Sequence, residues 1–599
     1  MKLLNQRTFL FFLRYIISEY GPQILLLVVL LVLVAFITGM SITLVIPFLE
    51  QAAEMGVKSS EKDIISSFIL KLFSILGLNV CITNILVLFF FLILLQALIT
   101  QFGQHYIAKI HVSFTRNLSK KLFKGYLNAS LPYFYKAKLG KLVNNITTEV
   151  GRASNTLTLF AYMLREICMI TIYLIIPCLI SWQLSIYAIM LGILFTFFTK
   201  RLHISAEHFG KKLTESNIIV QSEVSEKLSA IKDVKSNVKE EFVYDTVINK
   251  AISTLLFYRY KSMFNLALVG NIQTFLGGII LIFVIIVSVY YLRLSFMQLI
   301  LFLLTFQRLM PCVVAVQRWY NEIIVTLPSL WVILSTLDET KKYEEIEKPD
   351  QLNLDKIDNG IIMSNVSFYY QHDGRDFRLN NLNIEFKNNK ITALVGKSGS
   401  GKSTIVDIVL GFNKPSQGSV FVDNVSVEHF NIKSIRKQIG YVAQDSVLFN
   451  DTILNNICWG ASMVSIEEVN RASQLANIDD FISKLPNGYD TIVGDRGVTI
   501  SGGQKQRIIL ARNILRKPNI LILDEATSNL DTESERLILN SIKKLAQKMM
   551  IIFITHRLAS TKIADFIYVI EDGKVIESGT WELLYNRTNN QFNYLLPFD

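Results

Sequence analysis

The residues with the clearest chemistry lie in the segment Ile391–Ile408, which reads ITALVGKSGSGKSTIVDI. Its first residues are apolar and partly β-branched, as in a buried parallel strand, and its last residues alternate like one face of a helix. The glycine-rich turn between them can point backbone N–H groups inward, at the start of a helix whose dipole favours an anion. This G-x-x-x-x-G-K-S pattern predicts binding of ATP with Mg²⁺. The nucleotide-binding candidates are Gly396, Lys397, Ser398, Gly399, Ser400, Gly401, Lys402, Ser403 and Thr404, with Lys402 facing the β- and γ-phosphates and Ser403 as a Mg²⁺ ligand.

Two carboxylates end a second apolar run, ILILDE. Asp524 fits the acidic residue that holds Mg²⁺, and Glu525 fits a general base for the water that attacks the γ-phosphate. A strand ending in Asp-Glu is common by chance, but it is informative when it follows a phosphate loop. Between the phosphate loop and these carboxylates, Ser501–Gln504 (SGGQ) offers backbone N–H groups at the start of a predicted helix.

The rest of the chain must position these groups, and its composition indicates a membrane. The chain has 599 residues, of which 51% are hydrophobic, and its mean hydropathy of +0.38 is too high for a wholly soluble protein. Apolar runs long enough to span a bilayer predict six transmembrane helices. They lie near Gln23–Phe48, Asn84–Thr100, Thr156–Ile180, Leu184–Phe198, Ala267–Tyr291 and Phe296–Val316.

The formal net charge of +11 is compatible with nucleic acid, but its distribution favours the cytoplasmic face of a membrane. The segments after the second and fourth spans hold the basic excess, so both termini and the α/β domain are predicted to be cytoplasmic, with no nucleic-acid partner. The basic residues are Lys109, Arg116, Lys120, Lys121, Lys124, Lys200, Arg201, Lys211 and Lys212. The five cysteines lack C-x-x-C spacing, which indicates packing residues rather than a zinc site or disulfides.

Those two basic segments read as helical, so the membrane helices are expected to continue into water. The two segments are expected to turn near Thr147–Arg152 and Glu226–Ile231, where short helices could press on another domain, with solvated loops as the alternative. The segment Glu61–Leu76 carries a strict apolar stripe. It predicts an amphipathic helix on the outer membrane surface or one packed on the ends of the spans.

Three ionisable residues fall inside predicted spans, where charge is costly. Arg165 and Glu166 lie in the third span and Arg308 lies in the sixth. They are candidate substrate contacts. The alternative is an internal Arg–Glu pair, or side chains that reach the interface.

The predicted domains are a transmembrane domain over residues 1–339, a charged linker over 340–358 and a nucleotide-binding domain over 359–599. The fold class is therefore a polytopic α-helical membrane domain, with six transmembrane helices and cytoplasmic extensions, fused to an α/β P-loop ATP-binding cassette.

Together these motifs resemble the ATP-binding cassette (ABC) exporters, in particular a half-transporter with one six-span domain and one cassette. The resemblance implies an ATPase coupled to transport. By the same resemblance Tyr370 looks like the adenine-stacking aromatic, Gln444 the Q-loop residue that senses Mg²⁺ and the γ-phosphate, and His556 the switch histidine that acts in catalysis with Glu525. This chain has Asp495 where the family usually has Glu, Ile500 where it has Leu, and Asn529 where it has Ala.

The family pattern also implies a dimer, because the signature residues of one cassette close over ATP held by the other. Those residues are Ser501, Gly502, Gly503 and Gln504. Since both Glu525 and His556 are present, the expectation is a homodimer, with pairing to a different half-transporter as the alternative.

The cargo is expected to be amphiphilic. ITLVIPFL in the first span, the outer amphipathic helix and the run Arg308–Pro311 resemble bacterial lipid-linked oligosaccharide flippases, which implies the bacterial cytoplasmic membrane. Gln96 and Asn271 are neutral where a basic cavity lining could have continued. A multidrug, lipid or peptide exporter stays open, and the chain's start lacks the Cys/His peptidase domain of peptide-processing relatives.

Overall fold

Long helices form the first of two units into which the computed structural model divides, Met1–Asn128 with Ala137–Lys342. The second unit comprises Ala129–Lys136 and Tyr343–Asp599. The structure describes residues 2–45, 71–180, 219–291, 296–345, 349–369, 378–494, 497–526, 532–555 and 558–587, except for single positions within them, and scattered positions between these ranges.

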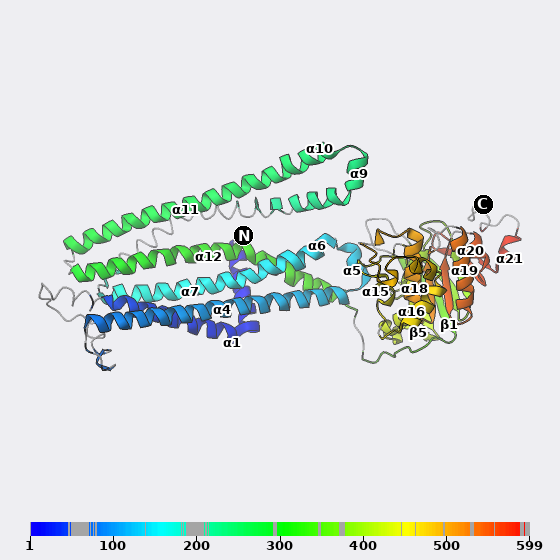
Figure 1. The fold of residues 1–599 in the computed structure, drawn as a ribbon, viewed down its shortest axis with the longest axis horizontal. Coiled ribbons are helices and arrows are strands. Elements are labelled where there is room, and N and C mark those ends of the chain that lie inside the picture. The colour runs from blue at the N-terminus through cyan, green and yellow to red at the C-terminus, as the bar shows by residue number, and fades with distance from the viewer. Residues whose placement is uncertain are drawn as a thin grey trace. The chain divides into compact units, whose positions relative to one another are not determined.

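The helices of the first unit pack through apolar stripes. Ile37, Ile85, Ile176 and Leu301 form one buried cluster that joins α1, α4, α7 and α12, and α7 and α12 pack along each other (Figure 1). The helices are α1 (Lys2–Thr43), α4 (Ile82–Asn128), α6 (Leu139–Asn144), α7 (Val150–Ile180), α9 (Ile231–Ser236), α10 (Glu240–Tyr244), α11 (Ser253–Ile286) and α12 (Phe296–Lys342), with π-helical turns at Asn145–Glu149, Asp245–Ile252 and Val287–Tyr291.

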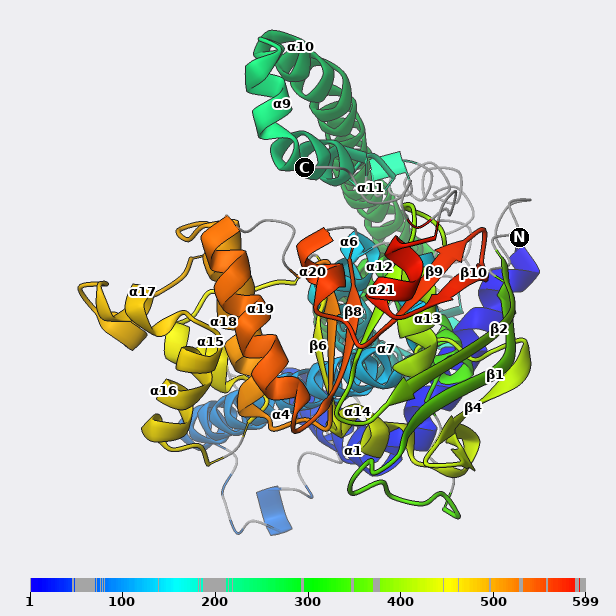
Figure 2. The same ribbon diagram turned by 90° about the vertical axis from the view of Figure 1, so that its right-hand side faces the viewer.

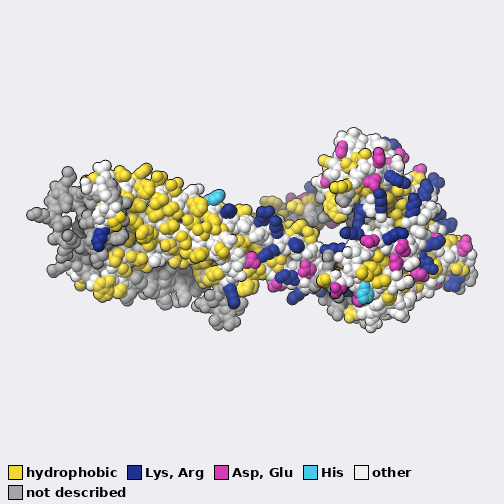
Figure 3. Space-filling model, turned by 90° about the horizontal axis from the view of Figure 1, so that it is seen from below, with side chains coloured by type: hydrophobic (Ala, Val, Ile, Leu, Met, Phe, Trp, Pro, Cys, Tyr) yellow, Lys and Arg dark blue, Asp and Glu magenta, His cyan; other side chains and the backbone are white. Residues whose placement is uncertain are grey.

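Helix α4 shows how sequence sets the membrane position. Its 47 residues extend about 70 Å, more than twice the thickness of a hydrocarbon core. Exposed apolar side chains between Leu86 and Phe102 are followed by exposed basic ones between Lys109 and Lys124. On the face of this unit in Figure 3 the hydrophobic side chains form a band, and Lys and Arg gather beyond it. Helix α4 thus runs without a break from an apolar part into a basic part, as the predicted continuation of a membrane helix into water requires.

Four helical stretches of the described residues are long and apolar enough to cross a membrane: Phe11–Thr43, Ile82–Asn128, Leu139–Leu179 and Leu299–Lys342. The fifth predicted span lies in α11 and the π-helical turn that follows it. The fourth, Leu184–Phe198, and the outer helix Glu61–Leu76 lie largely outside the described residues and stay predictions.

The segment Thr147–Arg152 lies within a continuous helical run rather than forming a separate short helix. The preceding Asn145 is fully buried and donates to the hydroxyls of Tyr126 at 3.2 Å and Thr336 at 3.3 Å. These bonds fix the π-helical turn against α4 and α12. The chain therefore reverses its direction before the predicted segment, between α4 and α6. At the second predicted turn, the short helix α9 begins at Ile231, where the predicted segment ends.

The second unit is an α/β cassette with two sheets. A six-stranded sheet has the order β10-β9-β3-β8-β7-β6, with β10 antiparallel at its edge and the other pairs parallel. Its strands are β3 (Ile391–Val395), β6 (Ile439–Val442), β7 (Ile520–Asp524), β8 (Met550–Ile554), β9 (Phe566–Glu571) and β10 (Lys574–Gly579). An antiparallel sheet has the order β2-β1-β4-β5, from β1 (Gly360–Tyr369), β2 (Arg378–Lys387), β4 (Gln417–Val422) and β5 (Val425–Ser426).

The second unit also contains helices, some of which pack on its sheets (Figure 2). They are α5 (Leu131–Lys136), α13 (Lys402–Val409), α14 (Ile432–Lys437), α15 (Ile453–Cys458), α16 (Ile466–Leu475), α17 (Asp479–Ser483), α18 (Gly502–Leu515), α19 (Thr532–Ala546), α20 (Leu558–Lys562) and α21 (Trp581–Tyr585), with 3₁₀ turns at Val427–His429 and Gly488–Asp490.

The central strands are apolar throughout because both of their faces are buried. Leu521 and Leu523 belong to one core cluster, whereas Ile520 and Ile522 belong to the other, as the period of two along a strand requires. Because β3, β6, β7 and β8 are parallel, their carboxyl ends meet at one edge of the sheet. This edge positions the candidate site.

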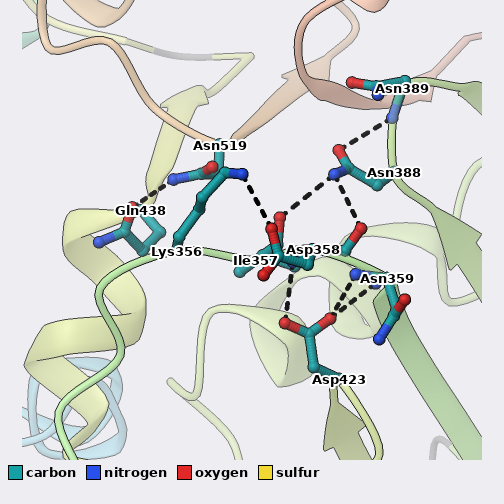
Figure 4. A network of polar contacts seen from close by, with 10 residues as sticks. Lys356, Ile357, Asp358, Asn359, Asn388, Asn389, Asp423, Gln438 and Asn519 are labelled. Atoms are coloured by element: carbon teal, nitrogen blue, oxygen red, sulfur yellow. Dashed lines mark hydrogen bonds and ion pairs between the residues drawn. The ribbon is translucent and has the colours of Figure 1, made fainter.

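A polar network fixes the chain where it enters β1. The Asp423 carboxylate accepts hydrogen bonds from the backbone N–H groups of Asp358, Asn359 and Gly360 at 2.6–3.0 Å. The Asn388 amide donates to the Asp358 carbonyl at 3.0 Å (Figure 4). These bonds supply hydrogen-bond partners to backbone N–H and C=O groups just before β1, where the chain is not yet paired in a sheet.

Candidate functional site

The turn between β3 and α13 requires its glycines. A Cβ at Gly396 would lie 2.2 Å from the Ile570 carbonyl oxygen. Gly399 and Gly401 have φ of +80° and +111°, which L side chains rarely adopt. The backbone can therefore approach a ligand closely, and α13 begins at the end of this loop. This geometry fits the predicted phosphate cradle, Gly396–Thr404.

Lys402 is held inside the loop by hydrogen bonds to it. Its Nζ donates to the carbonyl oxygens of Gly396 and Lys397, both at 2.8 Å, and lies 3.5 Å from the Ser400 hydroxyl. Burial lowers the pKa of Lys402, while the charges of Glu525 and Asp524 raise it. A buried ammonium whose third N–H has only a long contact is suited to bind a phosphate oxygen.

Asp524 ends β7 and is 6% exposed. Burial raises its pKa, the Glu525 charge adds to this, and hydrogen bonds with Tyr441 and Ser403 act in the opposite direction. The Tyr441 hydroxyl donates to a carboxylate oxygen at 3.3 Å. The structure thus brings the predicted metal residues Ser403 and Asp524 together.

This donor set fits Mg²⁺, a hard cation that takes oxygen ligands and is usually held by one or two carboxylates plus phosphates and waters. Ser403 offers a hydroxyl oxygen and Asp524 a carboxylate. No group of three or more His, Cys, Asp or Glu suited to a metal occurs among the described residues. A dedicated protein cage, as for zinc, is therefore not indicated in this part of the chain.

Glu525 and Gln444 meet at the same edge, from the ends of β7 and β6. The Gln444 Nε2 donates to a Glu525 carboxylate oxygen at 2.8 Å, which leaves the amide oxygen of Gln444 for a cation. Glu525 has φ of +49°, and its backbone N–H donates to the Ile554 carbonyl at 3.1 Å. Such a backbone in a non-glycine residue is held by its surroundings and is frequent at functional sites.

The signature residues begin α18. The Ser501 hydroxyl accepts from the Gln504 backbone N–H at 3.3 Å, and the side-chain Oε1 of Gln504 accepts from the Ser501 backbone N–H at 2.9 Å, which makes a capping box. Gly502 and Gly503 occupy the first helical turn. Within the cassette, α18 lies apart from α13 (Figure 2). The structure therefore does not bring Ser501–Gln504 to the phosphate loop of the same chain.

Tyr370, His556, Asp495 and Asn529 lie outside the described residues, so their predicted roles stay predictions.

Sequence reasoning missed two polar residues beside the site, Tyr441 and Asp407. Burial, with the nearby Asp524 charge, raises the pKa of Asp407 from 3.8 to about 6. Asp407 follows the phosphate loop by one helical turn, and its carboxylate interrupts the otherwise apolar IVDIV run. That interruption is the sequence feature from which Asp407 could have been identified as a candidate site residue.

A third missed residue, Arg512, joins the signature helix to the segment after Gln444. Its Nε donates to the Asn456 carbonyl at 2.7 Å, and its Nη1 donates to the Val447 carbonyl at 3.3 Å. Burial lowers the pKa of Arg512 to about 10.

The candidate substrate residues occupy different environments in the first unit. The Arg165 Nε donates to Glu166 at 3.0 Å, and Glu166 is 7% exposed. This matches the alternative of an internal pair. The Cys312 thiol on α12 interacts with the Glu166 carboxylate. Arg308, one helical turn before Cys312, is exposed.

The chain matches two family models, "ABC transporter" over residues 379–528 and "ABC transporter transmembrane region" over residues 60–311. It is 32% identical to the heterocyst differentiation ATP-binding protein HepA of Nostoc sp. over 505 residues, which are 84% of this chain and 82% of that protein. It is 31% identical to the leukotoxin translocation ATP-binding protein LktB of Mannheimia glucosida over 545 residues, 86% of this chain and 72% of that protein.

A solved structure of a bacterial Atm1-family ABC exporter with ATP bound aligns with a TM-score of 0.78 and 24% identity, covering 96% of this chain and 98% of that one. This likeness concerns the fold. With the family matches, it confirms the predicted fold class of a helical membrane domain fused to a nucleotide-binding cassette.

Proposed function

The chain belongs to the ABC transporter family, as a multi-pass exporter half-transporter, and its cassette is an ATPase coupled to transport. We propose that it acts as a homodimer that moves an amphiphilic substrate outward. The observation that supports this most directly is the convergence of Lys402, the Ser403–Asp524 pair and the Gln444–Glu525 pair at one sheet edge.

Each group has a separate task in the proposed hydrolysis. Lys402 binds the β- and γ-phosphates against the loop's N–H groups, and Ser403, Asp524 and the Gln444 amide oxygen hold Mg²⁺. When bound, Mg²⁺ neutralises charge on the phosphates. Glu525 takes the proton of the attacking water, and Gln444 fixes the orientation of that carboxylate. His556 and Tyr370 keep their proposed roles at the γ-phosphate and the adenine.

The homodimer is supported by the separation of α18 from α13 within one cassette. A second copy can supply Ser501–Gln504 to the nucleotide held at Lys402. Both Glu525 and His556 are present in the chain, so two such sites would be equivalent and competent. A purified single chain in lipid nanodiscs should form dimers by mass and hydrolyse ATP. Activity that required a different half-transporter would contradict the homodimer.

The proposed location is the cytoplasmic membrane of a bacterium, with both termini and the cassette in the cytoplasm. The order of apolar and basic residues along α4 supports this orientation. Proteolysis of inside-out membrane vesicles should release the cassette, whereas proteolysis from the outer side should leave it intact.

We propose lipid-linked oligosaccharides as the first substrate class to test, with Arg308 as the contact for an anionic head group. The exposed position of Arg308 supports this, whereas Arg165 and Glu166 already pair with each other. Polyprenyl-pyrophosphate glycans, reconstituted with the protein, should stimulate its ATPase, and Arg308→Ala should remove the stimulation with basal hydrolysis intact. Arg259→Ala, at an exposed position on α11, is the matched control.

A polypeptide is the second candidate cargo, because the chain is similar to leukotoxin translocation proteins over most of its length. Stimulation by peptides or by neutral and cationic amphiphiles, insensitive to Arg308→Ala, would contradict the flippase proposal and leave a general exporter.

A further inference from the structure

The chain passes between the two units at three points, after Asn128, after Lys136 and after Lys342. On the cassette side, the segments at these points are bonded to one another. Ala129 pairs with Glu344 in an isolated β-bridge, and the Ser130 N–H donates to the Tyr343 carbonyl at 2.8 Å.

Tyr343 also contacts α5, including Lys136, the last residue of that helix. The Lys136 Nζ donates to the Tyr343 hydroxyl at 3.1 Å, and the rings of Tyr133 and Tyr343 lie 5.8 Å apart. The three crossing segments, Ala129–Ser130, Tyr133–Lys136 and Tyr343–Glu345, therefore form one bonded cluster, which we call the crossing cluster.

The last residue of the crossing cluster, Glu345, forms a two-pronged ion pair with Arg436 on α14. The two N–O distances are 2.8 and 2.9 Å, and the side chains are only 20% and 23% exposed. Bidentate pairing of Arg with a carboxylate fixes geometry as well as adding energy. Limited exposure also reduces screening by solvent and salt.

The same guanidinium caps the phosphate-binding helix. Arg436 donates from Nε to the Leu410 carbonyl at 2.9 Å and from Nη2 to the Gly411 carbonyl at 3.1 Å, and it lies over the Phe412 ring. These carbonyls follow the last turn of α13, where cationic side chains are favoured. A Cβ at Gly411 would lie 2.1 Å from Ile432 of α14, so the two elements also touch.

Helix α13 is eight residues long, about 12 Å. Its first residues are Lys402 and Ser403, and Arg436 binds just beyond its other end. A short, buried helix moves as one body. A displacement of Glu345 is therefore passed through one guanidinium to the groups that bind phosphate and Mg²⁺.

We propose that Arg436 is a positioning residue that couples the crossing cluster to the phosphate loop through Glu345 and α13. This rests on the proposed ATP site at Lys402. Binding of ATP then alters the crossing cluster, and displacement of the crossing cluster alters ATP turnover. The two directions are linked because coupling of binding free energies is reciprocal.

Amide hydrogen exchange on the full-length protein in nanodiscs, with and without ATP and Mg²⁺, tests this. In the wild type, exchange should change both at residues 396–404 and at residues 129–136. Glu345→Gln removes the ion pair but leaves the Arg436 bonds to the carbonyls at the end of α13. Arg436→Lys keeps the positive charge but cannot form the two parallel hydrogen bonds to Glu345. In both variants we expect the response at 129–136 to fall about fivefold or more, while 396–404 stays protected.

The control is Lys356→Gln, which breaks an exposed ion pair with Asp358, both side chains being 68% exposed. It should behave like the wild type. An unchanged response at 129–136 in both Glu345→Gln and Arg436→Lys would overturn the inference while leaving the ATP site in place. Absence of protection at 396–404 in the wild type would instead overturn the ATP-site proposal, and this inference with it.

A second readout separates positioning from stability alone. Arg436→Lys should raise the KM for ATP with a smaller change in kcat, because the groups that bind phosphate shift while Glu525 stays in place. A lower melting temperature with unchanged KM and unchanged exchange coupling would show that the pair only stabilises the fold.

Discussion

The side-chain nitrogen of Gln444 lies 2.8 Å from a carboxylate oxygen of Glu525. The two residues are 81 positions apart and leave neighbouring parallel strands, β6 and β7, at the same edge. The bond orients the Glu525 carboxylate relative to the end of β6. The contact therefore places the proposed general base and the proposed Mg²⁺ sensor in one hydrogen-bonded unit.

Replacing Lys402 with Ala should weaken ATP binding itself, by at least about tenfold, because a charged donor to the phosphates is lost. Equilibrium binding of a fluorescent ATP analogue to the purified protein measures this. Lys414→Ala, at an exposed position in the same domain, is the matched control. Equal affinities for the two variants would remove Lys402 from the phosphate site.

Tyr441→Phe should raise the Mg²⁺ concentration that gives half-maximal ATPase activity by about threefold to tenfold. The phenol donates to Asp524 and helps to hold the carboxylate ionised and oriented. Tyr585→Phe, at a half-exposed position, controls for the loss of a hydroxyl. An unchanged Mg²⁺ dependence in Tyr441→Phe would show that Asp524 is oriented without it.

The motifs predicted the phosphate loop and the two carboxylates because their spacing along the chain is local. The apolar strands around them followed from burial on both faces, as Leu521–Leu523 show. Tyr441 and the Glu345–Arg436 pair were not predictable in this way. Tyr441 reaches Asp524 only through the register of β6 on β7, and Glu345 meets Arg436 across 91 positions. The turn near Thr147 was misplaced because the buried partners of Asn145 are on distant helices.

The pH dependence of stability should change in Asp407→Asn. Burial raises the pKa of Asp407 from 3.8 to about 6, so the folded state holds this proton more tightly than the unfolded state does. The wild type therefore loses stability as pH rises from about 4 to about 6, and the loss is complete above that range. Asparagine cannot ionise, so the variant should gain stability relative to the wild type as pH rises.

Melting temperatures of the nucleotide-free protein at about pH 4.5, 5.5 and 7.5 measure this difference. Asp480→Asn, at an exposed position, controls for the amide substitution. A difference between Asp407→Asn and the wild type that is constant over this range would contradict a titrating, buried Asp407.

The ATPase activity of Glu525→Gln beside the wild type, in purified full-length protein reconstituted in lipid, tests the central claim most directly. Glutamine keeps the shape of the side chain but cannot take a proton, whereas the cradle at Gly396–Thr404 is untouched. For Glu525→Gln we expect an ATP affinity within about twofold of the wild type and a turnover lower by about 100-fold or more. The control Glu533→Gln, at an exposed position, should be as active as the wild type. Full turnover in Glu525→Gln would contradict the proposed catalytic site.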